Sequence, residues 1–196
     1  MYFEVDKTYH LYNRSNETVF YNRDNYLYFL AKVNKLIKPY TYILSWCLMP
    51  NHFHFLFVAN SNGCKYIQEK HRPYVQILSK NIGTLLSSYT RAINKEHKRK
   101  GKLFAHNTIA KCLNDNIKND DFLENCFHCI HQNPLRAGLC NTLETWEFSS
   151  FRDYAGYRSG KLINKDLASE MINFDSEDFV TQSYAVVDER IVKGMF

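Results

Sequence analysis

Apolar and polar positions in the first third of the chain follow two periods, which predict a strand, a helix and a hairpin. Residues 8–14 alternate with a period of two, as in a half-buried strand. Residues 25–37 place apolar side chains at helical spacing, with Asp24 as the expected N-cap and Pro39 as the stop. Two apolar runs joined by a short turn then predict paired strands at residues 41–48 and 52–59.

The second part of the chain predicts two more helices around one more strand. Residues 74–98 carry a long apolar stripe at helical spacing, and residues 103–113 have strand character. Residues 120–131 predict a late helix with an apolar stripe, closed by Pro134.

The resulting β-α-β-β-α-β order predicts an α+β fold, with a ferredoxin-like antiparallel sheet and helices packed on one face. We expect one domain over residues 1–157 and a C-terminal tail over residues 158–196. The length of 196 residues and the hydrophobic content of 45% suit a single core of this kind.

The charge balance is mildly basic, with a formal net charge of +5 and a pI near 8.8. This balance permits nucleic-acid binding but does not establish it. Apolar runs stay well short of the roughly 20 residues of a membrane span, and the N-terminus lacks the pattern of a signal peptide. We therefore expect a cytoplasmic protein without a membrane partner.

His52 and His54 are the first candidate functional pair. Alternate side chains of a strand face the same way, so these two histidines share one face while Phe53 and Phe55 point to the other. Two imidazoles that converge on one point are able to hold a divalent metal ion. The alternative is a pair of solvent-facing histidines on an edge strand.

Several motifs accompany this pair in a fixed order. They are YHLYNR at 9–14, LMPNHFH at 48–54, SYTRAINK at 88–95, GKLF at 101–104, CIHQNPLRAGL at 129–139 and WEFSSF at 146–151. The ordered set, from about residue 7 to about residue 157, closely resembles the single-tyrosine HUH transposases. The most similar branch is that of the REP-associated tyrosine transposases.

The resemblance implies a site and a reaction. In such enzymes two histidines and a polar residue of a later helix hold Mg²⁺ or Mn²⁺, which here map onto His52, His54 and Asn133. The metal polarises a phosphate of single-stranded or hairpin DNA, and a tyrosine one helical turn before the polar ligand forms a 5′-phosphotyrosine link. That nucleophile position maps onto Cys129. A homodimer is compatible with the resemblance.

Cysteine at position 129 changes the expected chemistry. A thiolate is a softer nucleophile than a phenolate, and its side chain is shorter by a ring. We expect a protein that binds DNA but is impaired in strand cleavage and rejoining, and whether it is an enzyme stays open. Tyr12, Tyr89 and Tyr154 are candidate replacement nucleophiles, although most tyrosines are packing residues. The alternative is an inactive DNA-binding relative, such as a repressor or a structure-specific binder.

A third class of function, a cytosolic metal or redox protein, is indicated by the C-x-x-C formed by Cys126 and Cys129. Such a pair supplies half of a zinc site or a redox couple. The segment reads as a helix whose apolar stripe includes Cys126, and we therefore expect Cys126 in the core. Cytoplasmic thiols are expected to stay reduced.

Basic residues near the end of the long helix are candidate DNA contacts. Three of them, Arg91, Lys95 and Lys98, fall on nearly one helix face. The alternative is a solvated helix end whose cations complement the helix dipole. Tyr12 and Phe104 are candidates for stacking on bases, with core packing the expected role of Phe104. The full predicted DNA-binding set is Arg14, Arg91, Lys95, Lys98, Arg99, Lys100, Lys102 and Arg136.

Overall fold

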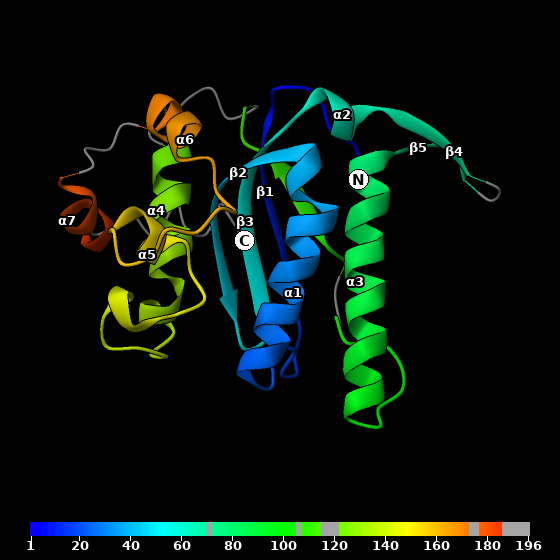
Figure 1. Cartoon of the computed structure of the whole chain (residues 1–196), viewed down its shortest axis with the longest axis horizontal. Helices are drawn as coiled ribbons and strands as arrows, with labels where there is room; N and C mark the ends of the chain where they lie inside the picture. Colours follow the sequence, from blue (N-terminus) through cyan, green and yellow to red (C-terminus); the bar gives the residue numbers. More distant parts are fainter. Residues whose placement is uncertain (70–71, 105–106, 115–121, 173–176, 186–196) are drawn as a thin grey trace.

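A four-stranded antiparallel sheet forms the centre of the molecule (Figure 1). The structure, a computed structural model, describes residues 1–69, 72–104, 107–114, 122–172 and 177–185. The strand order is β2-β3-β1-β6. The strands are β1 (Thr8–Arg14), β2 (Thr41–Met49), β3 (His52–Ala59) and β6 (Ile109–Cys112).

The predicted α+β fold is confirmed, with the first three strands within one residue of their expected bounds. β6 is shorter than the predicted strand at 103–113. Leu103 and Phe104 are buried in the main apolar core instead of pairing in the sheet. The Phe104 ring meets Phe53 edge-on with centroids 5.8 Å apart, which confirms the core role expected for it.

Two helices, α1 (Arg23–Leu36) and α3 (Ile77–Glu96), pack on the sheet face that carries Phe53 and Phe55. The N-cap of α1 is Asn22, whose side chain accepts a hydrogen bond from the Asn25 amide, and not Asp24. Asp24 lies in the first turn, where a carboxylate favours the positive end of the helix dipole.

The opposite face of the sheet is covered by α4 (Phe122–Arg136), so helices pack on both faces and not on one face as predicted (Figure 1). Residues 120 and 121 of the predicted helix lie outside the described residues. Pro134 lies inside α4 and does not close it. Proline costs the helix one backbone hydrogen bond, and the turn continues because the Ala137 amide still donates to Asn133.

Short helices surround α4 and bury its outer side. Phe127 and Phe151 lie in one apolar cluster with Phe179. These elements are η2 (Leu143–Thr145), α5 (Phe151–Tyr154), α6 (Lys165–Met171) and α7 (Phe179–Tyr184).

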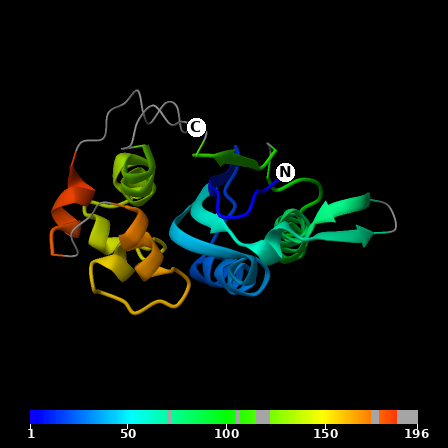
Figure 2. The same cartoon turned by 90° about the horizontal axis from the view of Figure 1, so that it is seen from above.

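A two-stranded hairpin, β4 (Tyr66–Glu69) and β5 (Arg72–Gln76), projects from the body just before α3 (Figure 2). It follows the short elements η1 (Lys38–Tyr40) and α2 (Ser61–Cys64). The predicted helix start at residue 74 is therefore wrong. Tyr74 has a φ of 66° and Gln76 is extended, so neither residue has helical backbone angles.

The outer edge of β2 is covered by a late part of the chain. The Leu48 amide donates to Phe148, the Ser150 amide donates to Trp46, and the Asn164 amide donates to Ile43. The proposed division at residue 157 stays a prediction, although segments on both sides of it contact β2. None of the helices in the described ranges is long and apolar enough to cross a membrane.

Candidate metal and nucleic-acid site

His52 and His54 share one face of β3, as predicted, and lie opposite the face on which α1 and α3 pack. Their ring centroids are 5.1 Å apart and the rings are nearly perpendicular. His54 is buried, whereas His52 is partly exposed. Both line a cavity of about 490 Å³ between the sheet and the end of α4. The other lining residues are Tyr12, Asn13, Arg14, Met49, Asn133, Arg136 and Ala137.

This cavity brings together the three predicted metal ligands, since Asn133 reaches it from α4. Imidazole nitrogen and amide oxygen are both ligands that divalent metals accept. The cavity also contains the charge expected around a phosphate, because Arg14 and Arg136 lie in its wall. Three segments far apart in the sequence supply these side chains, namely β1, β3 and the last turn of α4.

A hydrogen bond orients the His52 ring. Its Nδ1 lies 2.6 Å from Asn51 Oδ1, and a donor is needed opposite an amide oxygen. With the proton on Nδ1, the His52 Nε2 keeps its lone pair. That nitrogen is then the one able to bind a metal ion.

His54 has a different partner, His10 of β1, with His10 Nε2 and His54 Nδ1 3.0 Å apart. His10 is completely buried and was not among the predicted site residues. Tyr12, which stacks on His10 with ring centroids 4.9 Å apart, completes a row of three nearly parallel rings. The sequence signal was the alternation of His10 with Tyr12 on β1, but the pairing of β1 with β3 was needed to interpret it.

Burial holds both histidines of β3 in the neutral form. Removal from water lowers the pKa of His52 to about 4, and the positive charge of Arg14 acts in the same direction. Burial also lowers the pKa of His54 well below its usual range, with smaller contributions from His10, His52 and Arg14. Neutral imidazole is the form that binds metal ions, so the pair is ready to coordinate at neutral pH.

Cys129 lies in the apolar cluster beneath α4 and is only 3% exposed. Burial raises the pKa of its thiol to about 11, while the nearby Arg136 guanidinium acts in the opposite direction. The thiol is therefore protonated at neutral pH and a weak nucleophile. Cys126 is fully buried in the same cluster, which confirms its expected core position, and all six cysteines are free thiols.

The three candidate replacement tyrosines have different surroundings. Tyr89 is fully buried on the other side of the sheet, where its hydroxyl donates to the Val19 carbonyl at 3.0 Å. The Tyr154 hydroxyl donates to the Leu44 carbonyl at 2.6 Å. Tyr12 lines the cavity and stacks on His54 with centroids 5.9 Å apart.

The predicted DNA-binding residues form two groups instead of one face. Arg14 and Arg136 line the cavity, whereas α3 and the residues after it lie on the opposite face of the sheet. The two groups approach each other where Ser15, next to Arg14, donates from its hydroxyl to the carbonyl of Leu103, next to Lys102. The second group contains Arg91, Lys95, Lys98, Arg99, Lys100 and Lys102.

Two members of the second group have structural roles. Arg99 forms an ion pair with Glu17 and donates to the Tyr21 hydroxyl at 2.8 Å. Lys98 has a φ of 51° and lies just past the end of α3. The Arg99 amide donates to the Asn94 carbonyl, and the Lys98 amide donates to the Lys95 carbonyl. These two bonds close the helix in a Schellman motif.

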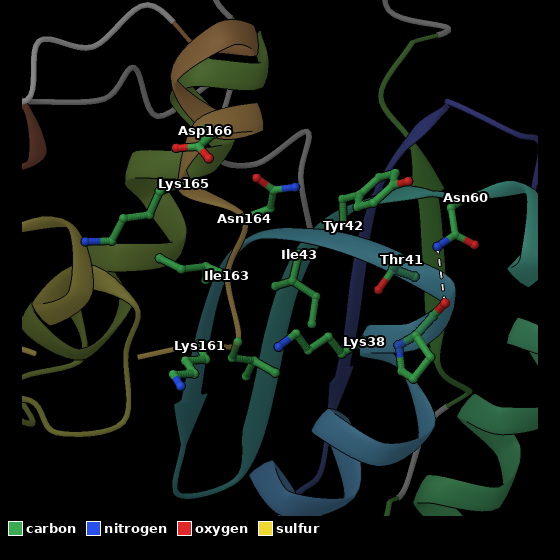
Figure 3. A pocket seen from close by; sticks show the side chains of 12 residues that line it. Lys38, Thr41, Tyr42, Ile43, Asn60, Lys161, Ile163, Asn164, Lys165 and Asp166 are labelled. Carbon is green, nitrogen blue, oxygen red and sulfur yellow. Dashed lines mark hydrogen bonds between the residues drawn. The ribbon is translucent and has the colours of Figure 1, made fainter. Parts of the chain in front are cut away.

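A second cavity, of about 520 Å³, lies beside the edge strand β2 (Figure 3). Its wall includes Lys38, Lys161 and Lys165, none of which was predicted to bind DNA. These cations do not converge on one point (Figure 3), and the Lys165 amine donates to the Asp153 carbonyl. The first cavity is therefore the candidate site.

Comparison with known proteins supports the fold. No family model and no curated protein matches the chain. Among solved structures, the chain is similar to a REP-associated tyrosine transposase bound to a REP hairpin, with a TM-score of 0.58 and 14% identity. The match covers 90% of this chain and 93% of the other. The predicted likeness to this transposase group is thus confirmed for the fold.

Proposed function

We propose that this chain is a transposase-like protein that binds single-stranded or hairpin DNA at the cavity between β3 and α4. The observation that carries the proposal is the assembly of His52, His54 and Asn133 with Arg14 and Arg136 in one cavity wall. The structurally similar transposase is bound to a REP hairpin, which supports a hairpin as the class of ligand.

Each side chain has a role that follows from its chemistry. Arg14 and Arg136 contact phosphate oxygens, because a guanidinium matches that geometry and keeps its charge. Tyr12 lines the cavity, where its aromatic ring offers a surface on which an unpaired base stacks. His52, His54 and Asn133 would hold Mg²⁺ or Mn²⁺, and the bound ion would supply the charge that polarises a phosphate. Mn²⁺ is the better probe, since Mg²⁺ strongly prefers oxygen ligands.

The buried, protonated thiol of Cys129 favours a protein that binds DNA without efficient cleavage. The Cys129 side chain is short and lies in the apolar cluster, so it is poorly placed to reach a phosphate in the cavity, and burial raises the pKa of its thiol to about 11, which keeps the proton on sulfur. We therefore propose that the cleavage reaction implied by the resemblance is impaired in this chain. A repressor or structure-specific binder is the function that this observation favours.

One pair of titrations tests the proposal. Mn²⁺ is titrated calorimetrically into the wild-type chain, His52→Ala and Asn133→Ala, with Lys35→Ala on the exposed side of α1 as the control. A fluorescent DNA hairpin with single-stranded flanks is then titrated with the wild-type chain and with Arg14→Ala/Arg136→Ala.

We expect Mn²⁺ binding to be lost or weakened at least tenfold in the two ligand variants, and unchanged in the control. The double arginine variant should bind the hairpin more weakly at every salt concentration. Equal hairpin affinity of the wild-type chain and Arg14→Ala/Arg136→Ala would refute the cavity as the DNA site. Absence of Mn²⁺ binding to the wild-type chain would refute the metal site while leaving a metal-independent DNA binder.

A further inference from the structure

His10 is a buried imidazole whose position the proposed function does not explain. It lies on β1 opposite Leu56, diagonally across from His54, and is 0% exposed. The hydrogen bond between His10 Nε2 and His54 Nδ1 is 3.0 Å long. A neutral pair at this distance shares one proton, so one ring donates and the other accepts.

We propose that His10 is a positioning residue for the metal site and accepts the hydrogen bond from His54 Nδ1–H. This inference rests on the proposed metal site and deepens it. With its proton on Nδ1, His54 keeps the lone pair of Nε2 for a divalent cation. The reverse arrangement would place a proton on His54 Nε2 and remove a ligand from the site.

The surrounding rings restrict the orientation of His54 as well as its proton. The His10 and His54 rings are stacked with centroids 5.2 Å apart and an interplanar angle of 24°. Tyr12 lies nearly parallel to both, at 28° to His10 and 26° to His54. Rotation of the His54 ring would break this stacking, so the ring plane is set by β1 before any ligand binds.

His52 follows the same logic with a different acceptor. Its Nδ1 lies 2.6 Å from Asn51 Oδ1, which leaves Nε2 as the nitrogen for coordination. Both histidines of β3 therefore have an Nδ1 partner from the protein. Such outer partners commonly raise the basicity of a ligand and change metal affinity 10- to 100-fold when removed.

The test separates positioning from simple filling of the core. His10→Gln retains an acceptor at about the place of Nε2, whereas His10→Leu fills the space without one. Thr8→Val is the matched control, because Thr8 is a buried residue two positions earlier on the same strand and pairs with Val58. Thermal denaturation of each full-length variant establishes that it is folded.

Two measurements are made at one neutral pH. In the metal-free protein, long-range ¹H–¹⁵N spectra of the imidazoles should show His54 protonated on Nδ1 in the wild-type chain and in His10→Gln. Calorimetry with MnCl₂ should show affinity about 10- to 100-fold weaker in His10→Leu, and within a few-fold of wild type in His10→Gln and Thr8→Val.

A proton on His54 Nε2 in the wild-type spectrum would overturn the inference. Equal Mn²⁺ affinity in His10→Leu and wild type would overturn it too. If the wild-type chain shows the Nδ1–H form but binds no Mn²⁺, the proposed metal site fails and the assigned direction of the hydrogen bond stands. The two failures are thus distinguishable.

Discussion

Cys129 and Asn133 lie one helical turn apart on α4, yet Asn133 lines the cavity while the Cys129 thiol lies in the apolar cluster beneath it. Arg136 interacts with the thiol and itself lines the cavity. A longer side chain at position 129 therefore has a route alongside Arg136 toward the proposed metal site. This relationship makes residue 129 the position at which catalysis is most directly tested.

Cys129→Tyr should give the protein the ability to form a covalent link to DNA. The phenol would lie one turn from Asn133, and the added ring should cost about 1–3 kcal/mol of stability through overpacking. The measurement is a denaturing gel of a labelled hairpin incubated with Mn²⁺. We expect a shifted band for Cys129→Tyr and none for the wild-type chain.

Cys129→Phe controls for the ring, because it imposes the same packing strain without a hydroxyl. It should bind DNA and form no adduct, and adding His52→Ala to Cys129→Tyr should abolish the gain. A wild-type adduct that disappears in Tyr12→Phe would identify Tyr12 as the nucleophile and contradict the mapping. An inert Cys129→Tyr that still binds DNA and Mn²⁺ would support the non-catalytic function.

Lys95→Glu should weaken hairpin binding for all sequences and flatten its salt dependence. A lost phosphate contact reduces the slope of log K against log salt by roughly 0.7–0.9, and charge reversal adds repulsion. Lys35→Glu, at the far end of α1, makes the same change in net charge and should leave the slope unchanged. Equal slopes for wild type and Lys95→Glu would identify Lys95 as part of a solvated helix end.

Arg99→Glu is expected to act first on stability. Its guanidinium is paired with Glu17 and bonded to Tyr21, so reversal of its charge brings two carboxylates together. The urea concentration at the midpoint of unfolding should be lower in Arg99→Glu than in wild type. The charge-swapped variant Glu17→Lys/Arg99→Glu should restore the midpoint. A normal midpoint with weak DNA binding would instead make Arg99 a phosphate contact.

Lys98→Gly should stabilise the protein by about 1 kcal/mol, because glycine adopts a φ of 51° without the strain of a Cβ atom. For a chain of this size the midpoint of thermal unfolding should rise by about 2–4 °C. Lys100→Gly removes the same charge outside the left-handed region and should not stabilise. Similar shifts in both variants would mean that charge, and not backbone strain, is responsible.

Acid should destabilise the folded chain between about pH 6.5 and pH 4. His128 is buried with its Nδ1 3.0 Å from Ser183 Oγ, and burial lowers its pKa to about 4. The unfolded chain binds this proton near pH 6.5, so the free energy of unfolding falls as pH falls and levels off below pH 4. His128 alone contributes up to about 3 kcal/mol.

Urea denaturation of the metal-free chain at intervals from pH 7.5 to pH 4 measures this slope. His128→Asn keeps a polar side chain that does not titrate, and should show a shallower dependence on pH. A slope that is the same in wild type and His128→Asn would show that His128 is not a source of the acid sensitivity.

Local sequence patterns were sufficient for the central strands, whereas the meeting of β3 with α4 was expected only from the resemblance to the HUH transposases. The alternation around His52 and His54 set which residues face the core, whereas the spacing of four between Cys129 and Asn133 did not place both side chains in one cavity. The strand alternation depends on short-range periodicity, which is the signal that a single sequence carries most strongly.

Features that depend on distant partners were not predicted. His10 became a site residue only through the register of β1 against β3. The β4–β5 hairpin was missed because its strands are short and Gln76, the N-cap of α3, has no side-chain capping bond that marks the helix start. The position of the basic residues relative to the histidines depended on which sheet face α3 covers.

The covering of the β2 edge has a consequence for synthesis on the ribosome. The Trp46 amide donates its hydrogen bond to the hydroxyl of Ser150, which lies 104 residues later in the chain. Until that segment leaves the exit tunnel, the outer edge of β2 presents unpaired amides and carbonyls to other nascent chains. Messenger RNAs truncated before the codon for residue 150 should therefore yield polypeptides that associate through β2. Chaperones that bind exposed strands should retain the growing chain until residue 150 has emerged from the ribosome.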